Sequence, residues 1–146
     1  MSSEENKACQ RRLVEEIINQ GNMAVAPEVV AEDFVERDPF PGQEQGRQGL
    51  IDIIAMMRTA FPDLEWTIEE QVAEGDTLAS YNVWRGTHQG VFLGIPPTGK
   101  RVTVPCMIFD YFVAGKLKES RLLMNSMSLM QQLGVAPAPG QAGSGP

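Results

Sequence analysis

The spacing of apolar residues changes along this chain, and the change separates a helical first half from a second half made of strands. Before Phe61, apolar side chains recur every three or four positions, which is the period of an amphipathic helix. Ser2 and Glu5 have the spacing of a capping box, and Pro27 suits a first helical turn. The pattern predicts three helices, over residues 2–20, over 27–34 with a short extended piece after it, and from Leu50 to a stop at Phe61.

From Leu64 the period becomes two, which is typical of strands. The alternation predicts strands over 66–72, 78–88, 100–113 and 116–125, and a last helical turn over 127–133. Short links between consecutive strands predict an antiparallel meander. Helices followed by strands indicate an α+β fold, in which the helices pack on one face of a curved antiparallel sheet. Such a sheet encloses a pocket, and the residues on its concave face determine the chemistry.

Composition limits the domain count and the classes of partner. A chain of 146 residues, 42% of them hydrophobic, fits one domain, which we place at 1–134. Residues 135–146 alternate Ala, Pro, Gly and Ser and are expected to be disordered. Nineteen acidic residues face twelve basic ones, and the basic residues form no run, so we expect neither nucleic acid nor a membrane surface as partner. The absence of a signal-peptide pattern leads us to expect a cytoplasmic protein.

Cysteine and histidine are too few and too widely spaced to predict a metal site. Cys9 and Cys106 are far apart in sequence, no CxxC occurs, and His88 is the single histidine. We therefore expect no metal ligands.

Several motifs occur in an order and spacing that identify a family. They are Ala60-Phe61-Pro62-Asp63-Leu64, Arg85-Gly86-Thr87-His88, Pro96-Pro97-Thr98-Gly99-Lys100, Gly115-Lys116 and Gln132-Leu133-Gly134. Together they resemble the SnoaL-like polyketide cyclases, which have the nuclear-transport-factor-2-like fold. The resemblance implies a cone-shaped barrel with an apolar cavity, a curved antiparallel sheet with three N-terminal helices, homo-oligomers (dimers or tetramers) through the sheet, and no bound cofactor.

The resemblance also implies where catalysis occurs and how it differs here. The family's proton-transferring aspartate falls ten positions after Gly115 and nine before Gly134, at Asn125. A carboxamide cannot accept and return a proton, although it can donate a hydrogen bond to an oxyanion. The family pattern has histidines at the positions of Arg37 and Tyr111, and many members have tryptophan at that of Arg121.

These departures favour a changed reaction on the same substrate class, a hydrophobic, carbonyl-rich aromatic polyketide such as an anthracycline-type aglycone. We expect hydroxylation, with molecular oxygen as the oxidant and a separate partner reductase supplying reducing equivalents. Asn125, Arg121, Tyr111 and Arg37 are the expected catalytic donors. The residues expected to bind the substrate are Trp66, Tyr81, Trp84, His88, Phe109 and Met124.

Other interpretations stay open on the sequence. Asn125 has an equally good role as the cap of the last helix. An aldol (ester) cyclase is the alternative enzyme, with Asp110 or His88 as the base. Asp110 and Tyr111 have opposite parity on one strand, so only one faces the cavity, and the resemblance favours Tyr111. A non-catalytic carrier or accessory protein is a third interpretation.

Overall fold

The computed structural model describes residues 2–136, so most of the predicted tail, 137–146, lies outside the described residues. The first half contains α1 (Ser3–Arg12), the π-helical η1 (Leu13–Asn19), the 3₁₀ turn η2 (Met23–Val25), α2 (Ala26–Val29), β1 (Val30–Glu36) and α3 (Gly46–Ala60). The second half contains β2 (Glu65–Glu74), β3 (Thr77–Thr87), β4 (Arg101–Val113), β5 (Lys116–Met124) and α4 (Ser126–Leu133).

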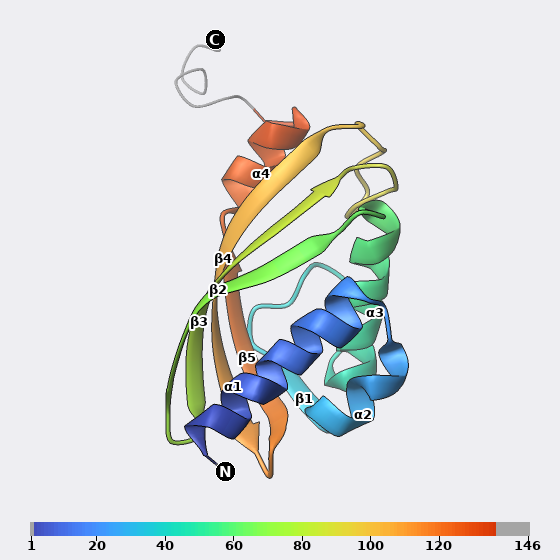
Figure 1. The fold of residues 1–146 in the computed structure, drawn as a ribbon. Coiled ribbons are helices and arrows are strands. Elements are labelled where there is room, and N and C mark those ends of the chain that lie inside the picture. The colour runs from blue at the N-terminus through green and yellow to red at the C-terminus, as the bar shows by residue number, and fades with distance from the viewer. Residues whose placement is uncertain (1, 137–146) are drawn as a thin grey trace.

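The five strands form one curved sheet in the order β1-β5-β4-β3-β2. Strands β2 to β5 make the predicted antiparallel meander. The edge strand β1 pairs parallel to β5, so the sheet is not wholly antiparallel. It curls without closing, and its two edges are β1 and β2 (Figure 1). The α+β class and the curved sheet are confirmed.

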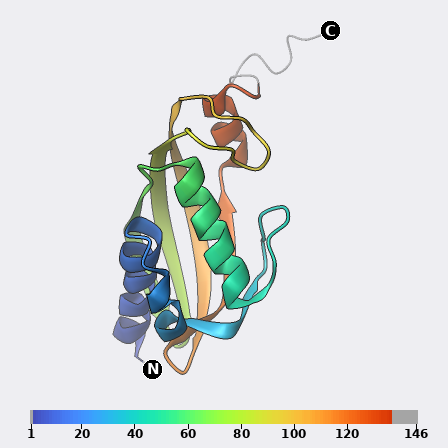
Figure 2. The ribbon, with the colours of Figure 1, turned by 90° about the vertical axis from the view of Figure 1, so that its right-hand side faces the viewer.

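The helices of the first half lie on the concave side of the sheet. Figure 2 shows α3 running across the front of the strands with α1 beside it. The π-helical η1 continues α1 and buries Val14, Ile17 and Ile18. A segment with this wider turn often occurs at a functional site. The concave side is therefore enclosed between the sheet, the α1–η1 segment and α3.

The second predicted helix is shorter than expected. The helix α2 spans four residues, and strand β1 already begins at Val30. The β-branched pair Val29–Val30 favours an extended backbone, and Val30 pairs with Leu117 of β5. Tertiary pairing thus overrides the helical spacing on which the prediction over 27–34 rested, and a fourth helix, α4, stands at the end of the domain.

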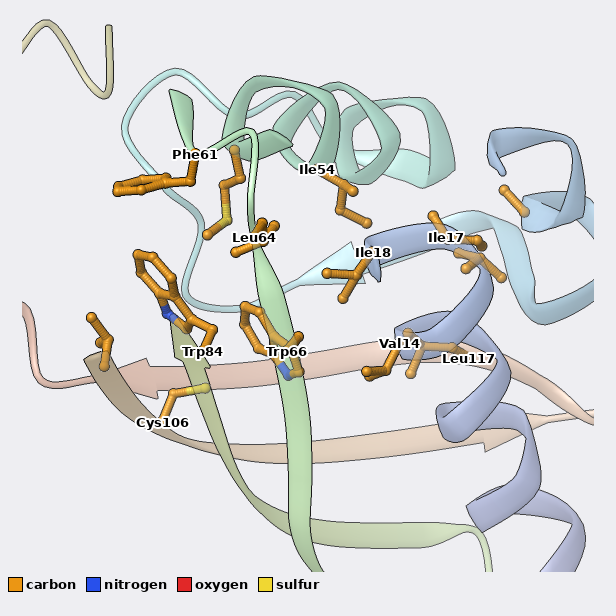
Figure 3. Close-up of a cluster of buried hydrophobic side chains, with 14 of the residues drawn as sticks. Val14, Ile17, Ile18, Ile54, Phe61, Leu64, Trp66, Trp84, Cys106 and Leu117 are labelled. Carbon is orange, nitrogen blue, oxygen red and sulfur yellow. The ribbon is translucent and has the colours of Figure 1, made fainter. Parts of the chain in front are cut away.

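A cluster of aromatic residues packs where α3 meets the sheet (Figure 3). The rings of Trp66 and Trp84 stack with their centroids 6.3 Å apart, and Phe61 packs edge-on against Trp84. Gly86 allows this packing, because a Cβ atom there would lie 2.8 Å from Cβ of Phe61. Part of the family-like motif Arg85–His88 therefore has a packing role.

None of the helices within residues 2–136 is both long enough and apolar enough to cross a membrane.

Candidate functional site

A cavity of about 80 Å³ lies between the helices and the concave face of the sheet. Its wall is mostly apolar. Helical residues that line it include Leu13, Val14, Ile18, Leu50, Ile53, Ile54 and Met57, and the sheet contributes Phe34, Trp66, Ile108, Leu117 and Leu122. The polar and acidic residues of its wall are Gln10, Glu36, Asp38, Gln43, Asp110 and Ser120.

Asp110 is the most deeply placed acid of the cavity wall. It lies on β4 and is only 2% exposed. Its Oδ2 accepts a hydrogen bond from Gln10 Nε2 at 3.2 Å, whereas Oδ1 has no hydrogen-bond partner within residues 2–136. Burial raises the pKa of Asp110 to about 7, although hydrogen bonds from Ser120 and Gln10 oppose that shift. A carboxyl with such a pKa can release and accept a proton near neutral pH.

Glu36 is a second acid of the same cavity, at the end of β1. It is 8% exposed, and its Oε2 accepts a hydrogen bond from the backbone N–H of Asp38 at 3.2 Å. Burial raises the pKa of Glu36 to about 7, with a further rise from the charges of Asp110 and Asp38. The Asp38 and Arg37 backbone N–H groups act in the opposite direction. Two acids with raised pKa values therefore share one apolar cavity.

A chain of side-chain hydrogen bonds fixes how Gln10 faces Asp110. Gln71 Nε2 donates to Gln10 Oε1 at 2.8 Å, so the amide N–H groups of Gln10 point the other way. They donate to Ser80 Oγ at 2.8 Å and to Asp110 Oδ2. On the far side, Asn82 Nδ2 donates to Ser80 Oγ, and Trp66 Nε1 donates to Asn82 Oδ1. The network thus joins a cavity-lining indole to the carboxyl of Asp110.

The predicted catalytic donors lie outside this cavity. Asn125 is exposed and caps α4, with its Oδ1 accepting from Ser128 N at 3.0 Å. Arg121 is exposed and sits opposite Phe109 on the convex face of the sheet. Arg37 forms an ion pair with Glu119 at the surface. The residue count from the glycine turns predicts an inward side chain at Asn125, but that side chain is exposed and caps α4 instead.

The choice of Tyr111 over Asp110 as the inward residue of β4 is wrong. Asp110 lies on the cavity wall, and Tyr111 lies on the opposite face, where its ring contacts that of Phe109. The even positions of β4 face the core, as the burial of Val102, Val104 and Cys106 shows. That row of apolar residues is visible in the sequence and places Asp110 inward by parity alone.

Of the predicted substrate-binding residues, Trp66 lines the cavity. Trp84 is fully buried behind it, and Met124 packs against the core. Tyr81 and Phe109 are exposed on the convex face.

His88 is fully buried beside Phe61, away from the cavity wall. Its Nδ1 bonds Thr98 Oγ1 at 3.0 Å, which ties the loop after β3 to the strand end. Its position therefore indicates a structural role for the only histidine of the chain.

Sequence reasoning missed Gln10 and Glu36. Gln10 follows Asn6 by one helical turn on the face that α1 buries, and polar residues repeated on an apolar face were the available signal. Glu36 was missed because β1 begins at Val30, within the helix predicted over 27–34, so the alternation of inward and outward residues along this strand was not recognised.

Residues 2–136 contain no group of three His, Cys, Asp or Glu side chains able to hold a metal ion. Cys9 and Cys106 are free and buried, and burial raises the pKa values of their thiols to about 11 and about 12. Both sulfurs therefore stay protonated at neutral pH.

Comparison with known proteins identifies the family. The family model described as "SnoaL-like polyketide cyclase" matches residues 8–133. No protein of curated function matches the chain.

Solved structures share the fold over nearly the whole domain. TsrD from Streptomyces laurentii superposes with a TM-score of 0.85 at 22% identity, covering 92% of this chain and 98% of TsrD. AclR from Streptomyces galilaeus, a proposed hydroxylase, superposes with a TM-score of 0.79 at 28% identity, covering 94% of this chain and 89% of AclR. IdmH from Streptomyces antibioticus, a proposed polyketide cyclase, superposes with a TM-score of 0.78 at 26% identity, covering 89% of this chain and 99% of IdmH. The family match over most of the chain, on this fold and around this cavity, shows that the protein belongs to the SnoaL-like polyketide cyclase family.

Proposed function

We propose that the protein tailors a carbonyl-rich aromatic polyketide by intramolecular aldol ring closure, without a bound cofactor. The observation that carries this proposal is the pair of buried acids, Glu36 and Asp110, on the wall of an apolar cavity. Acids in such surroundings have pKa values suited to proton transfer at neutral pH. Hydroxylation was the first expectation from the sequence, but its donors Asn125, Arg121, Tyr111 and Arg37 lie outside the cavity.

Ring closure needs only protons and electrons that the substrate and the cavity acids provide. A carboxylate removes a proton from the carbon beside a carbonyl, and the electron pair of that C–H bond moves into an enolate. The enolate carbon forms a C–C bond to a second carbonyl of the same molecule. The new alkoxide then takes the proton back from the carboxylic acid, so the product has one more ring and an unchanged mass.

The cavity is small for this substrate class. Its volume of about 80 Å³ is below the ~300–1,000 Å³ of ordinary ligand pockets. Asp38, Phe40 and Gln43 form part of its wall, and they belong to the irregular segment 37–45 between β1 and α3. We therefore propose that a multi-ring substrate enters as this segment moves away from α3.

Hydroxylation remains the second candidate, and the 28% identity to AclR, a proposed hydroxylase, is the observation that favours it. In that reaction molecular oxygen and a partner reductase would supply the oxidant and the electrons. The product would be heavier by one oxygen atom.

The two reactions are separated by product mass. The protein is incubated with a polyketide quinone or its uncyclised precursor, once alone and once with NADPH, a reductase and oxygen. Ring closure predicts a product of unchanged mass in both mixtures, whereas hydroxylation predicts the added oxygen in the second mixture only. Saturable binding with no product in either mixture would support a carrier.

We also propose that the convex face of the sheet joins two copies of the chain. Tyr81, Met107 and Leu123 are register partners across three strands, and their side chains are 39%, 55% and 68% exposed. Phe109, in the next row, is 41% exposed. Arg121 lies opposite Phe109 at the border of this row, and a two-fold axis across the face can place the apolar rows of the two copies against each other.

A further inference from the structure

We propose that the two cavity acids have separate roles: Asp110 stays protonated and donates a hydrogen bond to the substrate's carbonyl oxygen, whereas Glu36 takes the proton from carbon. This assignment rests on the proposed function, because it divides the work of the same site. It adds Gln10 as a positioning residue that acts through Asp110.

The surroundings of Asp110 favour its neutral form. The lining residues within the described chain include no lysine, arginine or histidine, so no cation balances its charge. The other polar residues of the wall are instead acidic or neutral, namely Asp38 and Gln43 of segment 37–45, Gln10 and Ser120. Like charges in one low-dielectric space cannot both persist, so at neutral pH the pair keeps one proton. Asp110, at 2% exposure the more buried of the two, is the better place for it.

The hydrogen bonds of Asp110 determine which oxygen holds that proton. Gln10 Nε2 already donates to Oδ2, and a second hydrogen on Oδ2 would oppose this N–H. Oδ1 is buried and has no hydrogen-bond partner within residues 2–136, and Asp110 is one of the residues that line the cavity. A proton on Oδ1 is therefore free to point at a ligand oxygen, and an unmade hydrogen bond of a buried group provides the driving force for that contact.

The surroundings of Glu36 favour its ionised form by comparison. Its Oε2 accepts the backbone N–H of Asp38 at 3.2 Å, and the Arg37 backbone N–H also stabilises its anion. Glu36 lies at the end of β1, where the cavity wall passes into segment 37–45. A carboxylate there meets the substrate near the cavity mouth, while Asp110 holds the carbonyl oxygen deeper inside.

The proposed division of labour balances protons and charge. The Glu36 carboxylate takes the proton from the carbon beside the carbonyl and becomes a neutral acid. The enolate oxygen carries the negative charge and accepts the hydrogen bond of Asp110, which keeps its proton. After the C–C bond forms, the new alkoxide takes the proton from Glu36, and both acids return to their starting states.

Gln10 aims Asp110 because its own amide is held in one orientation. Gln71 donates to Gln10 Oε1 at 2.8 Å, and Gln10 donates to Ser80 and Asp110 from the other end. Rotating the Gln10 amide would break all three hydrogen bonds. The fixed N–H on Oδ2 therefore leaves Oδ1 as the oxygen that faces the ligand.

The test uses a small ketone, so that it does not depend on polyketide ring closure. The full-length protein is incubated with 2-tetralone in D₂O, and deuterium uptake beside the carbonyl is followed by NMR, with binding followed by tryptophan fluorescence because Trp66 lines the cavity. Glu36→Gln should lower the exchange rate by about 10²- to 10⁴-fold. Exposed Asp52→Asn and Glu69→Gln are the matched controls and should leave the rate unchanged.

Asp110→Asn separates a donor from a base. Its amide oxygen can accept the Gln10 N–H, so its NH₂ group faces the cavity and still donates. We expect it to retain the exchange rate within about tenfold and to lose the fall in rate at high pH. Asp110→Ala, which has no donor, should lose about 10²-fold or more. An inactive Asp110→Asn beside an active Glu36→Gln would overturn the assignment. It would also be overturned if 2-tetralone saturates the protein but takes up deuterium no faster than it does in D₂O without protein.

Gln10→Leu tests positioning through the pH profile. The Gln10 N–H stabilises ionised Asp110, so its removal should keep Asp110 neutral to higher pH and move the high-pH limb of the exchange profile upward. A purely structural role would reduce the rate without moving that limb, and this result would remove Gln10 from the proposal.

The outcomes also distinguish this assignment from the proposed function. Exchange that depends on Glu36 without ring closure of any polyketide would support the acid pair and contradict the aldol reaction. Ring closure that survives both Glu36→Gln and Asp110→Ala would support the function and overturn the pair.

Discussion

At the scale of single residues, burial of Asp110 makes folding stability depend on pH. Its pKa rises from 3.8 in the unfolded chain to about 7 in the fold, so between those values the folded chain holds a proton that the unfolded chain has released. The contribution of Asp110 to stability is therefore fully present below about pH 4 and is lost as pH rises from about 4 to about 7. Asp110→Asn should reduce this loss by about 2 kcal/mol or more, measured by urea unfolding at pH 5 and pH 8.

Asp52→Asn is the control for that measurement, because Asp52 is exposed on α3. It should keep the full loss of stability between pH 5 and pH 8. Equal pH dependence in wild type and Asp110→Asn would show that Asp110 is ionised in the fold at both pH values.

The cap at Asn125 predicts a different kind of effect. Its Oδ1 satisfies the backbone N–H of Ser128 in the first turn of α4, so Asn125→Ala should lower the free energy of unfolding by about 1 kcal/mol. Because Asn125 is outside the cavity wall, ligand affinity should not change. Calorimetric titration with a polycyclic quinone, beside urea unfolding, checks both statements, and weakened binding would bring Asn125 back into the site.

Arg121→Ala is expected to leave ligand affinity unchanged for the same reason. The sequence led to the opposite expectation, because Arg121 and Asn125 share parity on the last strand and the family position was taken to face inward. Arg121 lies on the convex face of the sheet, and Asn125 follows β5 as the cap of α4. The sequence predicts which residues of a strand point to the same side of the sheet. Which of the two sides faces the cavity depends on where the helices pack.

At the scale of elements, periodicity predicted well where it was long. The alternation over 100–113 corresponds to β4 within one residue, because thirteen residues with one apolar face leave no competing period. Residues 30–33 were mispredicted as helix, since four to seven residues fit a helical turn or a strand equally well. Val30 pairs with Leu117, 87 positions later, and this pairing stabilises the strand. A contact over such a sequence separation cannot be predicted from the local sequence.

The contact between α3 and β3 carries a prediction at this scale. A Cβ atom on Gly86 would lie 2.8 Å from Cβ of fully buried Phe61, whose ring packs against Trp84, His88 and Phe92. Gly86→Ala should therefore destabilise the fold by about 1–3 kcal/mol, as overpacked cores do, although alanine suits a strand better than glycine does. Thermal unfolding measures this destabilisation. An unchanged Tm would contradict the prediction and mean that the Phe61 side chain shifts without cost.

At the scale of the whole molecule, the proposed pairing of convex faces predicts the mass in solution. Phe109→Asp or Leu123→Lys should convert a dimer or larger assembly to monomer, because each puts a charge at the centre of the apolar rows. Sedimentation velocity at micromolar concentration gives the mass. Val91→Lys is the control, since Val91 is 59% exposed in the loop after β3 and not on the sheet. A monomeric wild type would contradict the pairing.

The small volume of the cavity has a consequence for the timing of the proposed turnover. If a product with several rings forms in this cavity of about 80 Å³, each cycle includes two displacements of segment 37–45, one for entry and one for escape. Motions of this kind take microseconds to milliseconds and often limit kcat. If escape is the slow event, added sucrose or glycerol will slow steady-state cycling through solvent friction, whereas deuterium at the reacting carbon will leave it unchanged.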